Sequence, residues 1–400
     1  MDFDLTPEQQ ALRRTIREFA QAEIAPHAAG WDARGEFPLA VIRQLGQLGV
    51  MGLPFPEEEG GVGAGTLELA LAIEELARVD ASVAITVSAN VGLAGAVLHQ
   101  FGSPAQRERW LVPLARGEIL GALAGTEPGA GSDVAAITTT ARLEDGTWRL
   151  NGTKAFITNA GTPLSRFVVV TAVTGEPGTA PAPPGRREIS MLLVPNGTPG
   201  YRIGPPYHKL GWHASDTREL VFEDCRVPED HLVGARGAGV RQFLAVLDGG
   251  RIGIAALAVG LAQGALDLAV DYAKQRYAFG EPIARKQAIQ FQLADLATEI
   301  EAARLLTYRA ALLRDRGLPH TQAAAMAKLF ASEVAVRAAS VSLQVHGGYG
   351  YMEEAPIARF YRDAKILTIG EGTSEIQRLV IARSMGLDRA AGPSPSPRDA

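Results

Sequence analysis

The chain changes its hydrophobic pattern twice, and this order of patterns constrains the fold more than any other feature of the sequence. Helical spacing dominates residues 1–120, short runs rich in β-branched and aromatic residues follow over 121–234, and helical spacing returns over 235–387. Neither a doubly wound sheet nor a TIM barrel fits, because both alternate strands with helices throughout. We therefore expect a multidomain α+β protein with an N-terminal α-helical domain, a middle small β-barrel or sandwich domain and a C-terminal four-helix bundle.

Start and stop residues place individual helices within the two helical parts. Thr6 and Gln9 form a capping box, with Pro7 at the first helical position. Further helices are predicted over 38–48 (ended by Gly49), over 66–78, twice between 81 and 116, and over 254–274, 289–316 and 321–345. Small side chains in the last part would let helix axes approach closely: Ala255, Ala258, Gly260 and Gly264.

The middle part contains short strand-like runs separated by turn residues. These runs are 148–151, 167–173, 189–194 and 219–222. The segment 175–185 is rich in Pro and Gly, which predicts a mobile loop between two strands. The tail 388–400, rich in Pro and Ser, is expected to be disordered.

Composition and charge exclude several classes of function. Positive and negative side chains are mixed along the chain and leave a net charge of −5, so the chain lacks the basic footprint of a nucleic-acid-binding protein. The single cysteine, Cys225, and an N-terminus unlike a targeting peptide indicate a cytoplasmic protein without an intramolecular disulfide. The seven histidines form no metal-binding motif. The uncharged stretch 81–106 is long enough to cross a bilayer, but its polar groups favour helices buried in protein over membrane insertion.

One acidic residue near the C-terminus is a candidate for proton transfer. Glu371 lies between Gly370 and Gly372, so the backbone on either side can bend and approach a ligand closely. Residues 374–377 (Ser-Glu-Ile-Gln) have the pattern of a capping box that opens a helix. A carboxylate in this position could be a general base or simply a solvated loop acid.

A second candidate site lies at the start of the β-rich part, in residues 126–133. The backbone N–H groups beside Gly129 and Gly131 could form an anion-binding nest, and Thr126 and Ser132 add hydroxyl groups. The stretch is not a dinucleotide fingerprint, because Val134 stands where the third glycine would have to be. A plain surface turn remains the alternative.

These two stretches and six others occur in the order found in acyl-CoA dehydrogenases, which the chain resembles. The eight motifs are residues 126–133, 151–159, 209–211, 222–228, 248–251, 276–280, 346–350 and 370–377. The resemblance covers nearly the whole chain, from about residue 3 to 386, and the shared order of eight motifs is far more specific than any single motif. The sequence is most similar to the short-chain and short branched-chain members of the family.

The resemblance implies FAD, held non-covalently between the middle domain and the C-terminal bundle. Positions matched to flavin contacts are Leu123, Thr126, Gly131, Ser132, Phe156, Ile157, Thr158, Thr373, Ser374 and Glu375. Positions matched to contacts with the FAD of a neighbouring subunit are Arg276, Gln287, Gln344, His346, Gly347 and Gly348. A homotetramer built as a dimer of dimers is therefore implied. Taken singly, Arg276 would be a surface charge and Gly347–Gly348 a helix-ending turn.

The resemblance further implies α,β-dehydrogenation of an acyl-CoA thioester to the trans-2-enoyl-CoA, with Glu371 as the base and an electron-transfer flavoprotein as the electron acceptor. Positions matched to substrate contacts are Ser132, Asp248, Arg251 and Gly372, and those matched to the acyl-tail pocket are Ser88, Ala89, Asn90 and Val91. Arg251 could equally tie helices together through an acidic partner. Some relatives carry the base at the position of Gly250, which has no side chain to act.

Two departures from the family pattern leave the acyl group open. Phe156 stands where many relatives have Trp, and Gly370 where many have Tyr. The first keeps an aromatic ring for stacking but removes the indole N–H, and the second widens the region around the acyl tail. Two other activities remain as alternatives: an acyl-CoA oxidase that passes electrons to O₂, and a non-catalytic relative that binds acyl-CoA or flavin.

Overall fold

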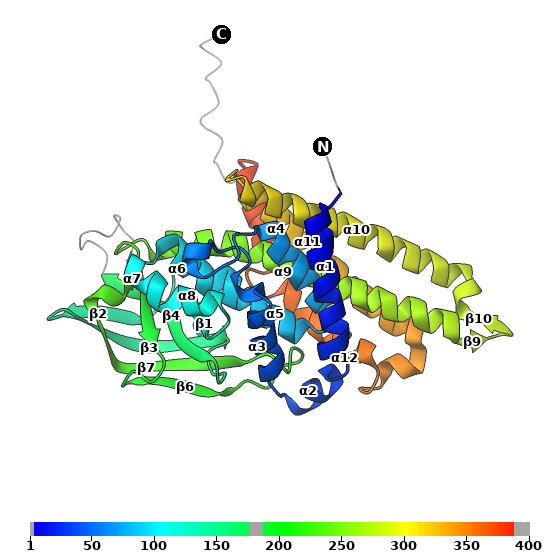
Figure 1. The fold of residues 1–400 in the computed structure, drawn as a ribbon, viewed down its shortest axis with the longest axis horizontal. Helices are drawn as coiled ribbons and strands as arrows, with labels where there is room; N and C mark the ends of the chain where they lie inside the picture. The colour runs from blue at the N-terminus through cyan, green and yellow to red at the C-terminus, as the bar shows by residue number, and fades with distance from the viewer. Residues whose placement is uncertain (1–3, 176–186, 388–400) are drawn as a thin grey trace, which may run out of the picture.

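The computed structural model describes residues 4–175 and 187–387, which form a sheet at one end of the molecule and a body of helices at the other (Figure 1). The predicted tail 388–400 and the predicted mobile loop, apart from Gly175, lie outside the described residues. The order of helices, strands and helices confirms the predicted fold class.

The N-terminal part is helical. Its α-helices are α1 (Pro7–Phe19), α2 (Ala28–Arg34), α3 (Leu39–Gln47), α4 (Thr66–Ala77), α5 (Ala81–Ala89), α6 (Ala96–Phe101), α7 (Pro104–Gln106) and α8 (Val112–Ala115). The capping box at Thr6 is confirmed, since its hydroxyl accepts from the Gln9 N–H and the Gln9 side chain accepts from the Thr6 N–H. A π-helical segment, η4 (Asn90–Gly95), joins α5 to α6, so that 81–101 is a single helical stretch.

The middle part is one eight-stranded sheet with strand order β6-β7-β3-β2-β4-β5-β8, and β1 pairs with β4 in parallel. The strands are β1 (Leu120–Ala124), β2 (Thr140–Glu144), β3 (Thr147–Thr158), β4 (Ser165–Gly175), β5 (Glu188–Pro195), β6 (Tyr201–Pro206), β7 (Thr217–Pro228) and β8 (Leu232–Val233). The four predicted runs fall in β3, β4, β5 and β7. The other four strands are short, and their sequences lack a sustained alternating pattern.

Three long helices form the C-terminal part: α9 (Gly239–Gln275), α10 (Gln287–Asp315) and α11 (Thr321–His346). Two shorter α-helices follow, α12 (Pro356–Ala364) and α13 (Ser374–Ser384). A small hairpin of β9 (Tyr277–Ala278) and β10 (Glu281–Pro282) connects α9 to α10, at the end of the molecule opposite the sheet (Figure 1). Both α12 and α13 pack on α11, which completes the bundle.

The two helical parts share one hydrophobic core, whereas the sheet has a second core of its own. Side chains of α4 and α5 pack with those of α9, α10 and α11 in a single buried cluster. Trp148, Leu150 and Phe222 belong to the separate cluster between strands. The helices before and after the sheet therefore form one packed body in space, although more than a hundred residues separate them in sequence.

Helix α9 lies unusually close to α4, and small residues make this possible. A Cβ atom on Gly260 would lie 2.1 Å from the carbonyl oxygen of Glu74, and one on Gly264 would lie 2.3 Å from that of Arg78. Both distances are far below van der Waals contact, so the two backbones touch where a side chain cannot fit. The predicted role of these glycines in close helix packing is confirmed.

We expect Gly260→Val to lower the free energy of unfolding by about 3 kcal/mol, because the added side chain must push α4 away from α9. Gly92→Ala is the matched control, since a Cβ atom at Gly92 meets no atom within 4 Å. Urea unfolding followed by circular dichroism measures both variants. Equal midpoints for the two would contradict the close contact at Gly260.

Within residues 4–175 and 187–387, two helical stretches are long and apolar enough to cross a membrane, 81–101 and α9. Within the fold, 89% of the apolar window in the first and 78% of that in the second is buried by protein. Such burial is typical of core helices, because their apolar side chains already face other helices. The prediction that 81–106 packs within protein is thus confirmed for its described helices.

Candidate active site

Glu371 lies on a tightly bent loop that leads into α13. Its backbone has φ +52°, in the left-handed region that is unfavourable for a residue with a side chain, and Gly372 follows with φ +88°. The N-cap of α13 is Thr373, whose hydroxyl accepts from the Ile376 N–H at 3.3 Å. The predicted capping box at 374–377 is therefore wrong, because the cap is one residue earlier and the Gln377 side chain bonds to the loop instead.

Two buried side chains hold this loop from different helices. The Lys328 ammonium on α11 donates to the Gly372 carbonyl at 2.7 Å. The Gln377 amide on α13 donates to the same carbonyl at 2.9 Å and to the Glu371 carbonyl at 3.2 Å. Both side chains are fully buried, so the bend at Glu371 is fixed by the fold rather than by solvent.

Glu371 is half-buried, one of its two carboxyl oxygens is enclosed, and its pKa is perturbed. Its Oε2 atom is buried and has no hydrogen-bond partner within residues 4–175 and 187–387. Burial raises the pKa of Glu371 to about 7, although the positive charges of Lys328 and Arg251 act in the opposite direction. A carboxylate of this kind can accept and release a proton near neutral pH, as a general base must.

Helix α9 approaches the same carboxyl at Gly250. A Cβ atom at this position would lie 2.5 Å from Oε2 of Glu371, so any side chain here would displace the carboxyl. Gly250 also lines an enclosed cavity between helices, together with Ile73, Ser88 and Gly253. Of the four positions matched to an acyl-tail pocket, only Ser88 lines this cavity. Asn90 instead accepts from the Gly121 N–H at 3.0 Å and joins the helices to β1.

Asp248 and Arg251 form an ion pair one turn apart on α9. Arg251 is almost completely buried, and its Nε atom has no partner in the part of the chain that the structure describes. Asp248 also accepts from the Thr321 hydroxyl at 2.6 Å. The acidic partner of Arg251 is thus on its own helix, and the helices are joined through Asp248 and Thr321 rather than through Arg251 itself.

A buried ion pair fixes the turn that follows β1. The Lys154 ammonium on β3 donates to Glu127 Oε1 at 2.8 Å, to the Gly125 carbonyl at 3.2 Å and to the Thr171 hydroxyl at 3.2 Å. The next residue, Ala155, donates its N–H to the Thr126 carbonyl at 2.9 Å. The structure therefore brings two predicted stretches together, because residues 125–127 are bonded directly to the strand that carries Phe156.

The Phe156 ring is exposed and suited to stacking against a ligand. Its side chain is 65% exposed, its φ is +61°, and its ring lies 5.2 Å from that of Tyr207. An exposed aromatic held by a strained backbone suits stacking against a flat ring. Cβ atoms at Gly129 and Gly131 would meet no atom within 4 Å, so the neighbouring turn also borders open space.

These observations fit the flavin that the resemblance implies. Thr126 and Thr158 are half-buried, Ser132 is exposed, and Leu123 lies partly exposed on β1. Ile157 is different, because its side chain is buried in the core of the sheet and only its backbone remains for a ligand. On the α13 side, the buried Ser374 hydroxyl has no partner among the described residues, and Glu375 is exposed in the first helical turn.

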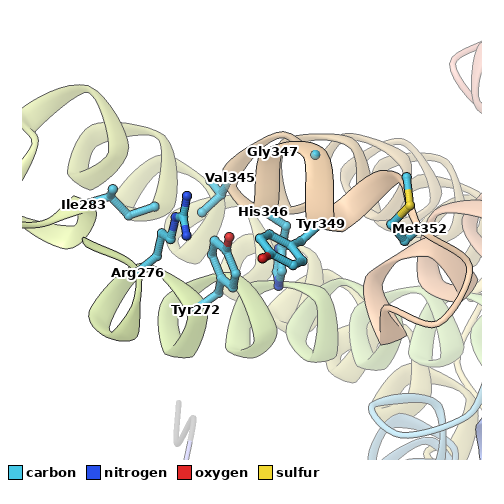
Figure 2. A pocket seen from close by; sticks show the side chains of 9 residues that line it. Tyr272, Arg276, Ile283, Val345, His346, Gly347, Tyr349 and Met352 are labelled. Atoms are coloured by element: carbon cyan, nitrogen blue, oxygen red, sulfur yellow. The ribbon is translucent and has the colours of Figure 1, made fainter. Parts of the chain in front are cut away.

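A pocket of about 470 Å³ lies at the far end of the bundle, between α9 and the end of α11 (Figure 2). Four predicted residues line it: Arg276, His346, Gly347 and Gly348. The rings of Tyr272 and His346 stack across it with centroids 4.4 Å apart, and the Arg276 guanidinium lies 5.8 Å from the Tyr349 ring centroid. Gln287 and Gln344 are exposed nearby but do not line the pocket.

The surface around this pocket is apolar and exposed. Large side chains there face solvent, namely Tyr277, Phe279, Phe291, Tyr349, Tyr351 and Met352. Phe279 is 95% exposed, which is unusual for an aromatic residue unless a partner covers it. Because the β9–β10 hairpin and the sheet are at opposite ends of the molecule, this pocket is separate from the turn at 125–132 of the same chain (Figure 1).

Sequence reasoning missed several residues that build these sites. Lys328 and Lys154 were not singled out, although a lone lysine within an alanine-rich or strand-forming run is a signal of a buried charge. Gln377 was assigned to a capping box. Tyr272, Ile283 and Met352 of the distant pocket carry no pattern that would have identified them.

Comparison with protein families gives three consecutive matches along the chain. The N-terminal domain of acyl-CoA dehydrogenase matches residues 6–118, the middle domain matches 122–225 and the C-terminal domain matches 237–386. Together they cover most of the sequence, including the Glu371 loop and the turn at 125–132.

Individual relatives align over nearly their full length. A probable acyl-CoA dehydrogenase of Bacillus subtilis is 50% identical over 385 residues, 96% of this chain and 100% of that protein. The solved butyryl-CoA dehydrogenase of Megasphaera elsdenii is 43% identical with a TM-score of 0.92, covering 96% of this chain and 100% of its own. A chain in a structure concerned with the electron-transferring flavoprotein of Acidaminococcus fermentans is 43% identical with a TM-score of 0.91, covering 96% and 99%.

Proposed function

Because this chain belongs to the acyl-CoA dehydrogenase family, we propose that it oxidises a short-chain acyl-CoA thioester to the trans-2-enoyl-CoA with Glu371 as the base. The single observation that carries this proposal is the Glu371 carboxyl, held by a fixed bend with its Oε2 enclosed and without a hydrogen-bond partner in the described chain. A solvated loop acid would have neither property.

Glu371 removes the proton from the carbon next to the thioester carbonyl. This proton is a weak acid, so the base must be ionised and desolvated when the substrate arrives, and a pKa of about 7 allows both near neutral pH. The bend at Gly372 leaves room beside the carboxyl, and the Glu371 N–H is the donor we assign to the thioester oxygen as negative charge develops there.

FAD, when bound, supplies the acceptor for the hydride that leaves the neighbouring carbon. The residues that would hold it are on the turn after β1 and the end of β3, where Thr126 and Ser132 offer hydroxyl groups and Phe156 offers an aromatic face. The Lys154–Glu127 pair acts indirectly, because it fixes the distance between this turn and the strand.

A second copy of the chain completes the site in this proposal. The pocket at Arg276, His346 and Gly347 offers a guanidinium and open backbone, which suit a phosphate or sugar, but it lies beside the β9–β10 hairpin, at the end of the molecule opposite the sheet (Figure 1). An exposed apolar surface surrounds it, as expected of a contact between subunits. We therefore propose a homotetramer, a dimer of dimers, in which each FAD contacts two chains.

The substrate class and the electron acceptor come from relatives. The butyryl-CoA dehydrogenase relative is named for a four-carbon acyl group, and the Acidaminococcus fermentans structure concerns an electron-transferring flavoprotein. We extend both to this chain, as a cytoplasmic enzyme that takes short acyl groups and passes electrons to an electron-transfer flavoprotein.

The purified protein is expected to be yellow, and butyryl-CoA is expected to bleach the flavin under anaerobic conditions. Linear acyl-CoAs of increasing length and 2-methylbutyryl-CoA, tested by the same absorbance change, identify the preferred acyl group. Reoxidation by electron-transfer flavoprotein without peroxide supports the dehydrogenase. Stoichiometric peroxide in air would instead identify an oxidase, and a flavin that no acyl-CoA bleaches would contradict the proposed function.

A further inference from the structure

Lys328 is a buried cation directly behind the catalytic loop, and neither the sequence motifs nor the ligand pockets account for it. It lies on α11 within an alanine-rich stretch, and its side chain has no exposed surface. Burying a lysine without an acidic hydrogen-bond partner is unfavourable, because the ammonium loses its hydration. A lysine that is buried in spite of this cost is a candidate for a functional role.

The Lys328 ammonium has one hydrogen bond, to the Gly372 carbonyl at 2.7 Å, among those of the described residues. This carbonyl already accepts from the Gln377 amide at 2.9 Å. A second neutral donor would therefore be enough to hold the loop. Unlike an amide, a lysine adds a full positive charge beside the loop that carries Glu371.

The charges near the loop come from three helices. Arg251 on α9 and Lys328 on α11 both favour the ionised form of Glu371. Burial lowers the pKa of Lys328 to about 8. The negative charges of Glu371 on the loop and Glu375 on α13 favour the charged form of Lys328, whereas the positive charge of Arg251 disfavours it. Arg251 is already neutralised by Asp248 on its own helix. Of these two cations, Arg251 forms an ion pair with a carboxylate, whereas Lys328 forms none among the described residues.

We propose that Lys328 is a positioning residue for the reaction, holding the Gly372 carbonyl and supplying the positive charge that keeps the Glu371 carboxylate ionised before substrate arrives. The proposal rests on the function assigned to Glu371. The proton taken from the substrate goes to Glu371, and Lys328 neither gives nor receives one. Its effect is electrostatic, and it also fixes the geometry of the bend.

Two substitutions separate the charge from the hydrogen bond. Lys328→Gln removes the charge but leaves an amide that can still donate to the Gly372 carbonyl, whereas Lys328→Met removes both. Lys365→Met is the control, because Lys365 is an exposed lysine on the segment before the same loop. The first-order rate of flavin bleaching by saturating butyryl-CoA is measured anaerobically from pH 5.5 to 9.5 for each protein.

The wild-type rate should rise with pH as Glu371 ionises. In Lys328→Gln the midpoint of this rise should move up by about one pH unit, so that the rate near pH 6 falls by about tenfold while the rate near pH 9 changes little. In Lys328→Met the rate should fall at every pH in addition to this shift, because the bend loses its second anchor. Lys365→Met should follow the wild-type profile.

A measurement that needs no turnover tests the same charge. Glu371 has a raised pKa in the folded protein, so its carboxyl contributes stability that is present at low pH and lost as pH rises through the folded pKa. The melting temperature of the wild type relative to Glu371→Gln should therefore fall as pH rises towards 7 and above. In the Lys328→Gln background this fall should be centred at higher pH.

The outcomes separate this proposal from the proposed function. If the wild type never bleaches, the function itself is wrong. If the wild type bleaches and Lys328→Gln lowers the rate equally at all pH values, with no change in its midpoint, Lys328 has a purely structural role and the proposal is overturned. Rescue of the midpoint by Lys328→Arg, which restores the charge, supports it, and a Lys328→Arg midpoint like that of Lys328→Gln contradicts it.

Discussion

Glu371→Gln is expected to slow flavin reduction by butyryl-CoA by about 10⁴-fold, because glutamine has nearly the same shape as glutamate but cannot accept the substrate proton. The bend at this position should persist, since the contacts that hold it are to the Glu371 and Gly372 carbonyls rather than to the carboxyl. Stopped-flow absorbance under anaerobic conditions measures the rate. The FAD content and the affinity for enoyl-CoA product should stay near wild-type values.

Glu18→Gln is the matched control for this substitution. Glu18 is exposed on α1 and is not among the positions matched to flavin or substrate contacts, so its loss should leave the rate within a factor of about two. A Glu371→Gln protein that reduces its flavin at the normal rate would remove Glu371 as the base. Because Gly250 has no side chain, the position that carries the base in some relatives offers no replacement here.

Lys154→Met is expected to lower the free energy of unfolding by about 3–5 kcal/mol, because it leaves the Glu127 carboxylate buried without its cation. Lys154 and Glu127 are both almost fully buried and joined at 2.8 Å. Burial alone would raise the pKa of Glu127, but hydrogen bonds from Lys154 and Thr139 and the Lys154 charge lower it to about 2. Denaturant unfolding at pH 7 measures the loss.

The Lys154–Glu127 pair also makes the stability of the protein depend on pH. Since the folded pKa of Glu127 is below its ordinary value, the stability it contributes is present above about pH 4.5 and is lost as pH falls towards 2. The double variant Lys154→Met/Glu127→Gln should recover a large part of the loss, because no unpaired charge remains. A double variant that is as unstable as Lys154→Met alone would show that the pair matters through packing rather than charge.

Loss of this pair should also weaken flavin binding, because Lys154 connects β3 to the turn at Gly125 and Glu127. Glu371 and the Lys154–Glu127 pair thus belong to different parts of one proposed site. The Glu371 loop is held by α11 and α13, whereas the turn proposed to bind flavin is held by the sheet. In the proposed function, FAD would lie between these two parts of the fold.

The sequence alone predicted the order of helices, strands and helices and most long helices, because helical spacing and capping residues can be seen within a few residues. The carboxylate between two glycines is visible in the same way, but its proposed role as the base came from the resemblance and not from the loop itself. Short strands such as β2 and β8 were missed because their patterns are too brief to distinguish from turns. The cap of α13 was placed one residue late because Thr373 and Ser374 are equally good capping residues.

What only the tertiary structure decided is the environment of these residues. Nothing near Glu371 in sequence indicates that Lys328, more than forty residues away, donates to its loop, or that α9 leaves room for the carboxyl only because residue 250 is glycine. The pKa of Glu371 depends on burial, and burial depends on helices that meet only after folding. The sequence could therefore indicate Glu371 as the proposed base, but only the packing of α9, α11 and α13 around it determined the charge and shape of its surroundings.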